Sequence, residues 1–185
     1  MSFLRAFQSF PNEAALVGRM VAGYADLEID LMHCAKEVSG GLDHVLKAMF
    51  RIRGNADRID VADALARQAY HRVGIGAQYE AAIAAVRFCL RIRNLYAHAA
   101  WWDDNTGQLA FANLAELAKG NVLVTNLLGL TVNHVTVRHL EAQLAYFDHA
   151  DDSLVWVIQE GNRLAGRPAL PARAVPTHAQ PPLYL

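Results

Sequence analysis

Basic and polar residues gather in one short segment of the 185-residue chain, at Arg87, Arg91, Arg93, Asn94 and His98. Guanidinium groups bind phosphate and carboxylate oxygens through paired N–H donors. Histidine exchanges a proton readily near neutral pH. The arginines can therefore hold a phosphodiester while the imidazole moves a proton. We take Arg93, Asn94 and His98 as candidate catalytic residues and Arg91 and Arg87 as secondary binding residues.

The segment that carries these residues is expected to be a buried helix with a narrow polar stripe. At about 100° per residue, the stripe spans an arc of roughly 60° and comprises Glu80, Arg87, Arg91, Asn94 and His98. Arg93 lies about 140° from His98 on an ideal helical wheel. Arg93 and His98 can therefore flank one phosphate only if the helix ends or bends near His98, or if a second copy completes the site. In a regular helix, Arg91 and Asn94 are the better neighbours of His98.

The run Arg93-Asn94-Leu95-Tyr96-Ala97-His98 resembles the R-N-x-x-x-H form of the Arg-x4–6-His motif of HEPN domains. The spacing from Arg91 to His98 fits the longer form of the same motif, and the likeness covers about residues 10–165. HEPN domains are small helical bundles that generally dimerise. Many are metal-independent ribonucleases, often toxins or antiphage effectors, whereas others bind nucleotides or RNA, or act as scaffolds without catalysis.

The resemblance implies two alternative functions. The first is a metal-independent endoribonuclease of a toxin or defence type, which cleaves RNA through its 2′-OH and uses no cofactor. The second is a non-catalytic HEPN-like module for dimerisation or for binding nucleotides or RNA, in which Arg93, Glu28 and Asn94 hold helices together. The formal charge of −1 favours the second, because RNA-binding proteins usually display a basic surface. A homodimer and RNA or a nucleotide are the implied partners, and a cognate antitoxin is not identified.

Two acidic residues of the first long helix, Glu28 and Asp30, are candidate ion-pair partners for the arginines of the polar segment. A buried guanidinium without a partner is costly, so we expect one of these carboxylates to pair with an arginine between residues 87 and 93. A second basic cluster, formed by Arg51, Arg53 and Arg58, is explained by a solvated helix end.

Hydrophobic periodicity predicts a mostly α fold, a bundle of about five helices with an inserted short β-hairpin and a Pro-rich extended tail. Helices are expected at about 13–38, 42–52, 57–73, 78–99 and from 131 or 133 to 164. The hairpin surrounds the turn 103–107, with a third strand at 121–125, and Trp101 and Trp102 are expected on opposite faces of its first strand. We expect one domain over 1–166, with the insertion at about 100–125. The tail, 167–185, is expected to be loose or to lie along a neighbouring subunit.

Composition sets further limits. A formal charge of −1 provides no global positive field for nucleic acid, so such binding must come from a local cluster.

Cys34 and Cys89 match neither a disulfide framework nor a zinc site and are expected to be buried free thiols. His134 and His139 are five residues apart, a spacing that does not place metal ligands on one helical face, so no metal site is expected. Because no apolar run reaches eighteen residues, we expect no membrane segment and a cytoplasmic protein.

Overall fold

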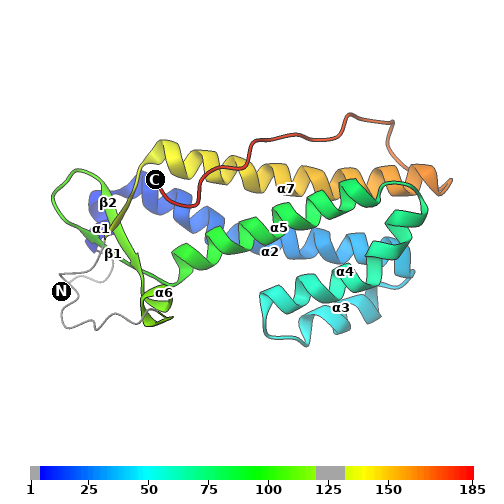
Figure 1. Ribbon diagram of the computed structural model, residues 1–185, viewed down its shortest axis with the longest axis horizontal. Helices are drawn as coiled ribbons and strands as arrows, with labels where there is room; N and C mark the ends of the chain where they lie inside the picture. Colours follow the sequence, from blue (N-terminus) through cyan, green and yellow to red (C-terminus); the bar gives the residue numbers. More distant parts are fainter. Residues whose placement is uncertain (1–4, 120–131) are drawn as a thin grey trace. The chain divides into compact units, whose positions relative to one another are not determined.

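The computed structural model describes residues 5–119 and 132–185 (Figure 1). Within these residues it contains seven helices and one three-stranded antiparallel sheet, which confirms the mostly α fold. The helices are α1 (Arg5–Ser9), α2 (Pro11–Ser39), α3 (Leu42–Phe50), α4 (Asn55–Arg72), α5 (Gly76–Ala97), α6 (Leu114–Lys119) and α7 (Val137–Leu164). The strands are β1 (Ala99–Asp103), β2 (Leu109–Asn113) and β3 (Asn133–Val135).

The five helices expected from periodicity correspond to α2, α3, α4, α5 and α7. Their ends follow local chemistry. Pro11 is the first residue of α2, where a missing backbone N–H costs no helical hydrogen bond. Gly40 follows α2 with φ +77°, a left-handed conformation that glycine adopts without a side-chain clash. The two additional helices, α1 and α6, are only five and six residues long, and so short a segment shows little periodicity.

The expected β-hairpin is present as β1 and β2, with Trp101 opposite Phe111 in the register. Side chains stabilise its turn: Asp103 Oδ1 accepts the backbone N–H of Asn105 at 2.9 Å, and Asp104 Oδ1 accepts that of Thr106 at 3.1 Å. Trp101 packs among tilted aromatic rings on one face of the hairpin. Neighbouring residues of a strand point to opposite faces, so Trp102 belongs to the other face.

The third strand differs from the prediction. β3 comprises Asn133–Val135 and pairs with β2, so the last helix begins later than residue 133. The predicted strand at 121–125 lies outside the described residues. The physical reason for the later helix start is an N-cap: Thr136 Oγ1 accepts the backbone N–H of His139 at 3.2 Å, which satisfies a donor of the first turn of α7.

Two compact units can be distinguished along the chain. The first comprises Met1–Ala22, Arg91–Ala145 and Gln180–Leu185, and the second comprises Gly23–Leu90 and Tyr146–Ala179. The helices α2, α5 and α7 contribute residues to both units. The tail also contributes residues to both.

Each unit has its own buried centre. In the first unit, an aromatic cluster joins α1, α5, β1 and β2, because the Trp101 ring lies 5.5 Å from that of Phe7, 5.6 Å from Tyr96 and 5.1 Å from Phe111. In the second unit, the rings of Tyr70 and Tyr79 stack at 4.8 Å. Cys34 and Cys89 are both buried free thiols in this unit, as expected. The cores therefore combine aromatic stacking with small apolar side chains.

The tail is extended, as expected, and it contacts α7 of its own chain. In the second unit it runs along α7 of the same chain (Figure 1). The indole Nε1 of Trp156 donates to the backbone carbonyl of Arg173 at 3.0 Å, and the ring of His178 lies 6.0 Å from that of Tyr146. In the first unit, Gln143 Nε2 donates to the carbonyls of Pro182 and Leu183. Polar backbone groups of the tail thus find partners on α7, which apolar periodicity does not reveal.

Candidate functional site

The motif segment lies where α5 ends and β1 begins. The last helical residue is Ala97 and the strand starts at Ala99, so His98 occupies the turn between them. Its backbone N–H donates to the Asn94 carbonyl at 3.3 Å. The ideal helical wheel therefore no longer fixes the direction of the His98 side chain. Because the helix ends near His98, Arg93 and His98 need not point in the directions of a regular helix, and this is one of the arrangements that would let both serve one phosphate.

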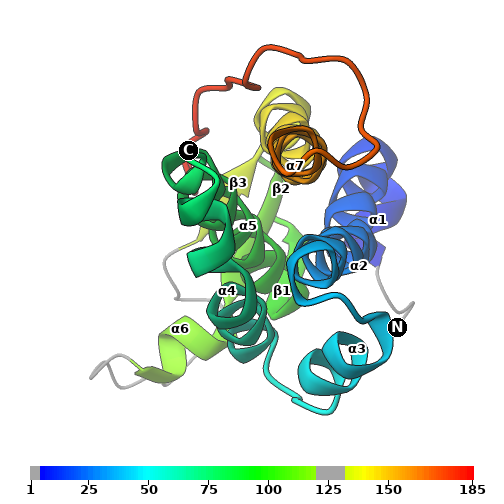
Figure 2. The ribbon, with the colours of Figure 1, turned by 90° about the vertical axis from the view of Figure 1, so that its right-hand side faces the viewer.

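Buried residues of the first unit hold this turn on both sides. Before it, the Tyr96 hydroxyl donates to Gln143 Oε1 at 2.5 Å. After it, Trp101 of β1 is fixed in the aromatic cluster. The sheet to which β1 belongs is seen in Figure 2. Asn113 Nδ2 donates to the Leu95 carbonyl at 3.3 Å, which satisfies an acceptor of the last helical turn that has no partner within the helix. The backbone at His98 is consequently anchored by α7 and the hairpin.

The candidate side chains at this helix end are accessible. His98 and Arg91 are exposed, whereas Arg93 and Asn94 are half-buried. Arg93 Nη1 donates to Asn94 Oδ1 at 3.1 Å. Among the described residues, no side chain forms a hydrogen bond with the His98 imidazole. Neither Arg93 nor His98 is sealed in a core, which a purely internal structural role would require.

The side chain that binds Arg93 determines whether the charge of its guanidinium is neutralised. An amide oxygen orients the guanidinium but does not neutralise it, and within residues 5–119 and 132–185 no carboxylate forms an ion pair with Arg93. A guanidinium has five N–H donors, so the remaining donors can bind an anion in a paired geometry. The segment therefore combines an oriented, uncompensated cation with an exposed imidazole.

Arg87 has a different environment in the second unit. Its Nη2 lies 2.6 Å from Asp60 Oδ1 of α4 in an exposed ion pair. Glu80, the first member of the polar stripe, accepts hydrogen bonds from Arg67 and from His71. Solvent thus reaches both Glu80 and Arg87 of the polar stripe, and Arg87 has a carboxylate partner of its own.

Glu28 does not pair with an arginine of α5, contrary to the expectation. Its carboxylate binds Arg58 of α4, with Nη1 at 3.0 Å from Oε2 and 3.2 Å from Oε1. Arg58 also donates from Nε to the Ile52 carbonyl at 2.9 Å, and its guanidinium lies 5.0 Å from the centre of the Phe50 ring. Arg58 is therefore a structural link between α2, α3 and α4 rather than part of a solvated basic cluster.

Asp30 pairs with another carboxyl group and not with an arginine. Burial, a hydrogen bond with Asp151 of α7 and the negative charges of Asp151 and Asp26 raise the pKa of Asp30 from 3.8 to about 7. Two carboxyl groups at such a contact share a proton. Asp30 is half-buried and forms a contact between α2 and α7 in the second unit, so it does not serve as the partner of an α5 arginine.

The raised pKa predicts a pH dependence of stability. Between about pH 4 and pH 7 the folded state holds a proton on Asp30 that the unfolded chain releases, so stability falls as the pH rises through this window. We expect Asp30→Asn to raise the free energy of unfolding at pH 8 by about 1 kcal/mol, a value reduced for partial solvent screening. Urea unfolding of both proteins at pH 5 and pH 8 measures this. An equal difference between the proteins at the two pH values would contradict the proton-sharing pair.

One polar pair was not anticipated. His134 Nε2 of β3 lies 2.8 Å from Asp104 Oδ2 in the hairpin turn, and Thr106 donates its hydroxyl and its backbone N–H to the same carboxylate. The hydrogen bond from the Thr106 hydroxyl and that from His134 lower the pKa of Asp104 to about 2. The register of β3 could have revealed this pair, but β3 itself was not predicted. Across the described residues, no group of three or more His, Cys, Asp or Glu has the arrangement of a metal site.

Searches against family models, curated proteins and solved structures found no match to this chain. In the described part of the chain, no helix has both the length and the apolar character needed to cross a membrane.

Proposed function

We propose that this protein is an HEPN-like, metal-independent endoribonuclease of a toxin or defence type that acts as a homodimer in the cytoplasm. The observation that carries the proposal is the position of the motif at the end of α5. There an exposed His98 follows the helix by one residue, and a neutral amide holds Arg93. Arg91 is exposed on the same helix end and serves as a further phosphate contact.

The reaction needs few groups. Neutral His98 takes the proton of a ribose 2′-OH while the 2′-oxygen forms a bond to the adjacent phosphorus. The bond from phosphorus to the 5′-oxygen breaks, and this oxygen takes a proton from water. The products are a 2′,3′-cyclic phosphate and a 5′-OH, and His98 returns its proton to the hydroxide that remains. Arg93 stabilises the negative charge of the phosphorane through paired N–H donors.

A non-catalytic HEPN-like module that binds RNA or nucleotides is the second candidate. The formal charge of −1 favours it, because affinity for an RNA backbone depends on many basic contacts. In this function Arg93 and His98 bind a phosphate and no bond is broken. A second copy supplies another Arg93 and His98 in either function, so dimerisation does not separate the two candidates.

Whether RNA is cleaved distinguishes the ribonuclease from the non-catalytic module. We expect the purified protein to cleave single-stranded RNA in EDTA and to leave 2′,3′-cyclic phosphate ends. An oligonucleotide with 2′-deoxyribose at every position should bind but remain intact, since it has no internal nucleophile. Intact RNA together with measurable binding would assign the non-catalytic function, and cleavage of the deoxy oligonucleotide would exclude the 2′-OH mechanism.

A further inference from the structure

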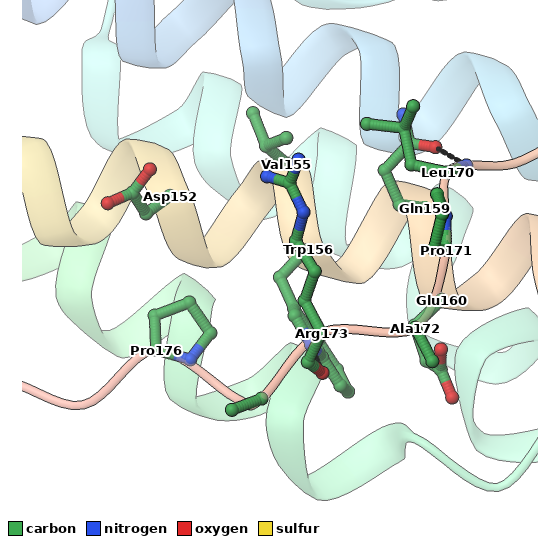
Figure 3. Close-up of a pocket in the computed structure, with 11 residues that line it drawn as sticks. Asp152, Val155, Trp156, Gln159, Glu160, Leu170, Pro171, Ala172, Arg173 and Pro176 are labelled. Carbon is green, nitrogen blue, oxygen red and sulfur yellow. Dashed lines mark hydrogen bonds between the residues drawn. The ribbon is translucent and has the colours of Figure 1, made fainter.

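The tail and α7 enclose a cavity in the second unit, and its lining contains none of the motif residues. We call the α7 side of it the α7 groove, which consists of Asp152, Val155, Trp156, Gln159 and Glu160. Tail residues Leu170–Ala174 and Pro176 form the opposite wall (Figure 3). The volume of the cavity is about 310 Å³. The groove therefore already holds an extended segment, whose contacts indicate what kind of occupant it takes.

The tail contacts the α7 groove with a period of three residues. The backbone N–H of Leu170 donates to Gln159 Oε1 at 3.0 Å, and the carbonyl of Arg173, three residues later, accepts the Trp156 indole N–H at 3.0 Å. Pro176, three residues further on, lines the same cavity. It is half-buried, whereas residues 165–175 are exposed. Three residues per turn is the repeat of polyproline II, and prolines at positions 168 and 171 favour that conformation. Residues 170, 173 and 176 thus share the edge that faces α7.

The contact with Trp156 is of a recognised kind. Pro-rich segments bind aromatic surfaces because their conformation is already formed and their carbonyl groups remain available as acceptors. Here an indole ring lines the groove and its N–H binds a carbonyl of the Pro-rich segment. The α7 groove therefore recognises an extended Pro-rich chain by its backbone.

The fit of the tail is incomplete. The 310 Å³ cavity remains beside short side chains of the tail, such as Ala172 and Ala174, and a second cavity of about 220 Å³ also has Trp156 and Pro176 in its wall. Two carboxylates, those of Asp152 and Glu160, line the larger cavity, and Glu160 is paired with Arg163. Among the described residues, neither Asp152 nor Arg173 takes part in an ion pair. The unfilled cavity volume suits a Pro-rich segment with larger side chains than those of the tail. The carboxylates of Asp152 and Glu160 suit a segment that also carries a basic residue.

We propose that the α7 groove is a docking site for an extended, Pro-rich segment of a partner protein that carries a basic residue. The chain's own tail occupies the groove until the partner displaces it. Gly166, with φ +69°, follows α7 and gives the chain a point at which the tail can turn away. The tail is tethered, so it competes at a high effective concentration and a partner must bind more tightly or meet a loosened tail.

Two proline substitutions, each made in the full-length chain, test the proposal. Leu170→Pro removes the N–H that binds Gln159 and keeps an extended backbone, whereas Ala169→Pro is a matched change at a residue with no such bond. The probe is a fluorescein-labelled peptide with the sequence of residues 168–176 in which both positions 172 and 174 are leucine. Loss of one hydrogen bond from the tail predicts about fivefold tighter probe binding by Leu170→Pro than by the wild type. Ala169→Pro should bind like the wild type.

Two further variants assign the binding to the groove. In the Leu170→Pro chain, Trp156→Phe keeps an aromatic ring and loses the N–H, and should weaken probe binding about fivefold. A probe with glutamate in place of its arginine should bind more weakly, and Asp152→Asn should reduce that preference. Circular dichroism of each variant verifies the helical content, so a loss of binding is not mistaken for unfolding.

Three outcomes would overturn the proposal. They are equal probe binding by wild type and Leu170→Pro, probe binding insensitive to Trp156→Phe, and a dimer in light scattering that Trp156→Phe dissociates. The last result would assign the groove to the tail of a second copy instead of a partner. None of these outcomes depends on whether the protein cleaves RNA.

Discussion

Replacing His98 with alanine is expected to lower the rate of RNA cleavage in EDTA by about 10²–10⁴-fold, the range for removal of a general base. His98 is exposed in the turn after α5, and its side chain forms no hydrogen bond with a described residue, so its loss should leave the fold intact. Initial rates on a labelled RNA, with protein in excess, measure the effect. Thermal unfolding of the variant should match that of the wild type.

The matched control is His44→Ala, which removes an exposed histidine from α3. It should cleave RNA at the wild-type rate. A His98→Ala protein that folds and cleaves as fast as His44→Ala would show that the imidazole has no catalytic role. Arg19→Ala, an exposed arginine of α2, is the corresponding control for Arg93.

The second large effect concerns stability. Arg58→Met keeps an apolar stem but removes the guanidinium that binds Glu28, whose side chain is only 7% exposed. A buried carboxylate left without its partner is costly, so we expect the free energy of unfolding to fall by about 3 kcal/mol. Replacing both residues, as Arg58→Met with Glu28→Leu, should cost less than Arg58→Met alone, because no charge then remains buried. Urea unfolding monitored by circular dichroism provides the values.

Arg87→Met serves as the comparison, since Arg87 also pairs with an aspartate of α4 but both side chains are largely exposed, at 42% and 60%. Exposed pairs contribute little, and this variant should lose less than about 1 kcal/mol. If Arg58→Met and Arg87→Met were equally stable, the pair between Glu28 and Arg58 would not be the link that holds α2 and α4 together.

Much of the architecture follows from local sequence. The long helices repeat apolar residues at spacings of three and four, and the Asp/Asn/Gly turn at 103–107 separates two short apolar runs. These signals involve neighbouring residues, so α2, α3, α4, α5, α7 and the hairpin were predictable. The end of α5 at His98 does not follow from neighbouring residues. It depends on Tyr96, Asn113 and Gln143, which come together only in the folded chain.

Contacts between distant residues were the source of the errors. Glu28 and Arg58 are thirty residues apart, and sequence spacing does not indicate which of several arginines a distant carboxylate will meet in the fold. β3 has only three residues, too few for a period of two to stand out. The tail has no apolar stripe, and backbone groups make its bonds to α7, so its position is invisible to side-chain patterns.

A double-variant comparison tests most directly whether Arg93 and His98 act on one phosphate. The rates of RNA cleavage in EDTA are measured for the wild type, Arg93→Ala, His98→Ala and the protein with both changes. Groups that act together in one transition state are strongly non-additive, so the double variant should be about as slow as the slower single variant. Losses that multiply in the double variant, or four proteins with the same rate or with no cleavage at all, would contradict the account.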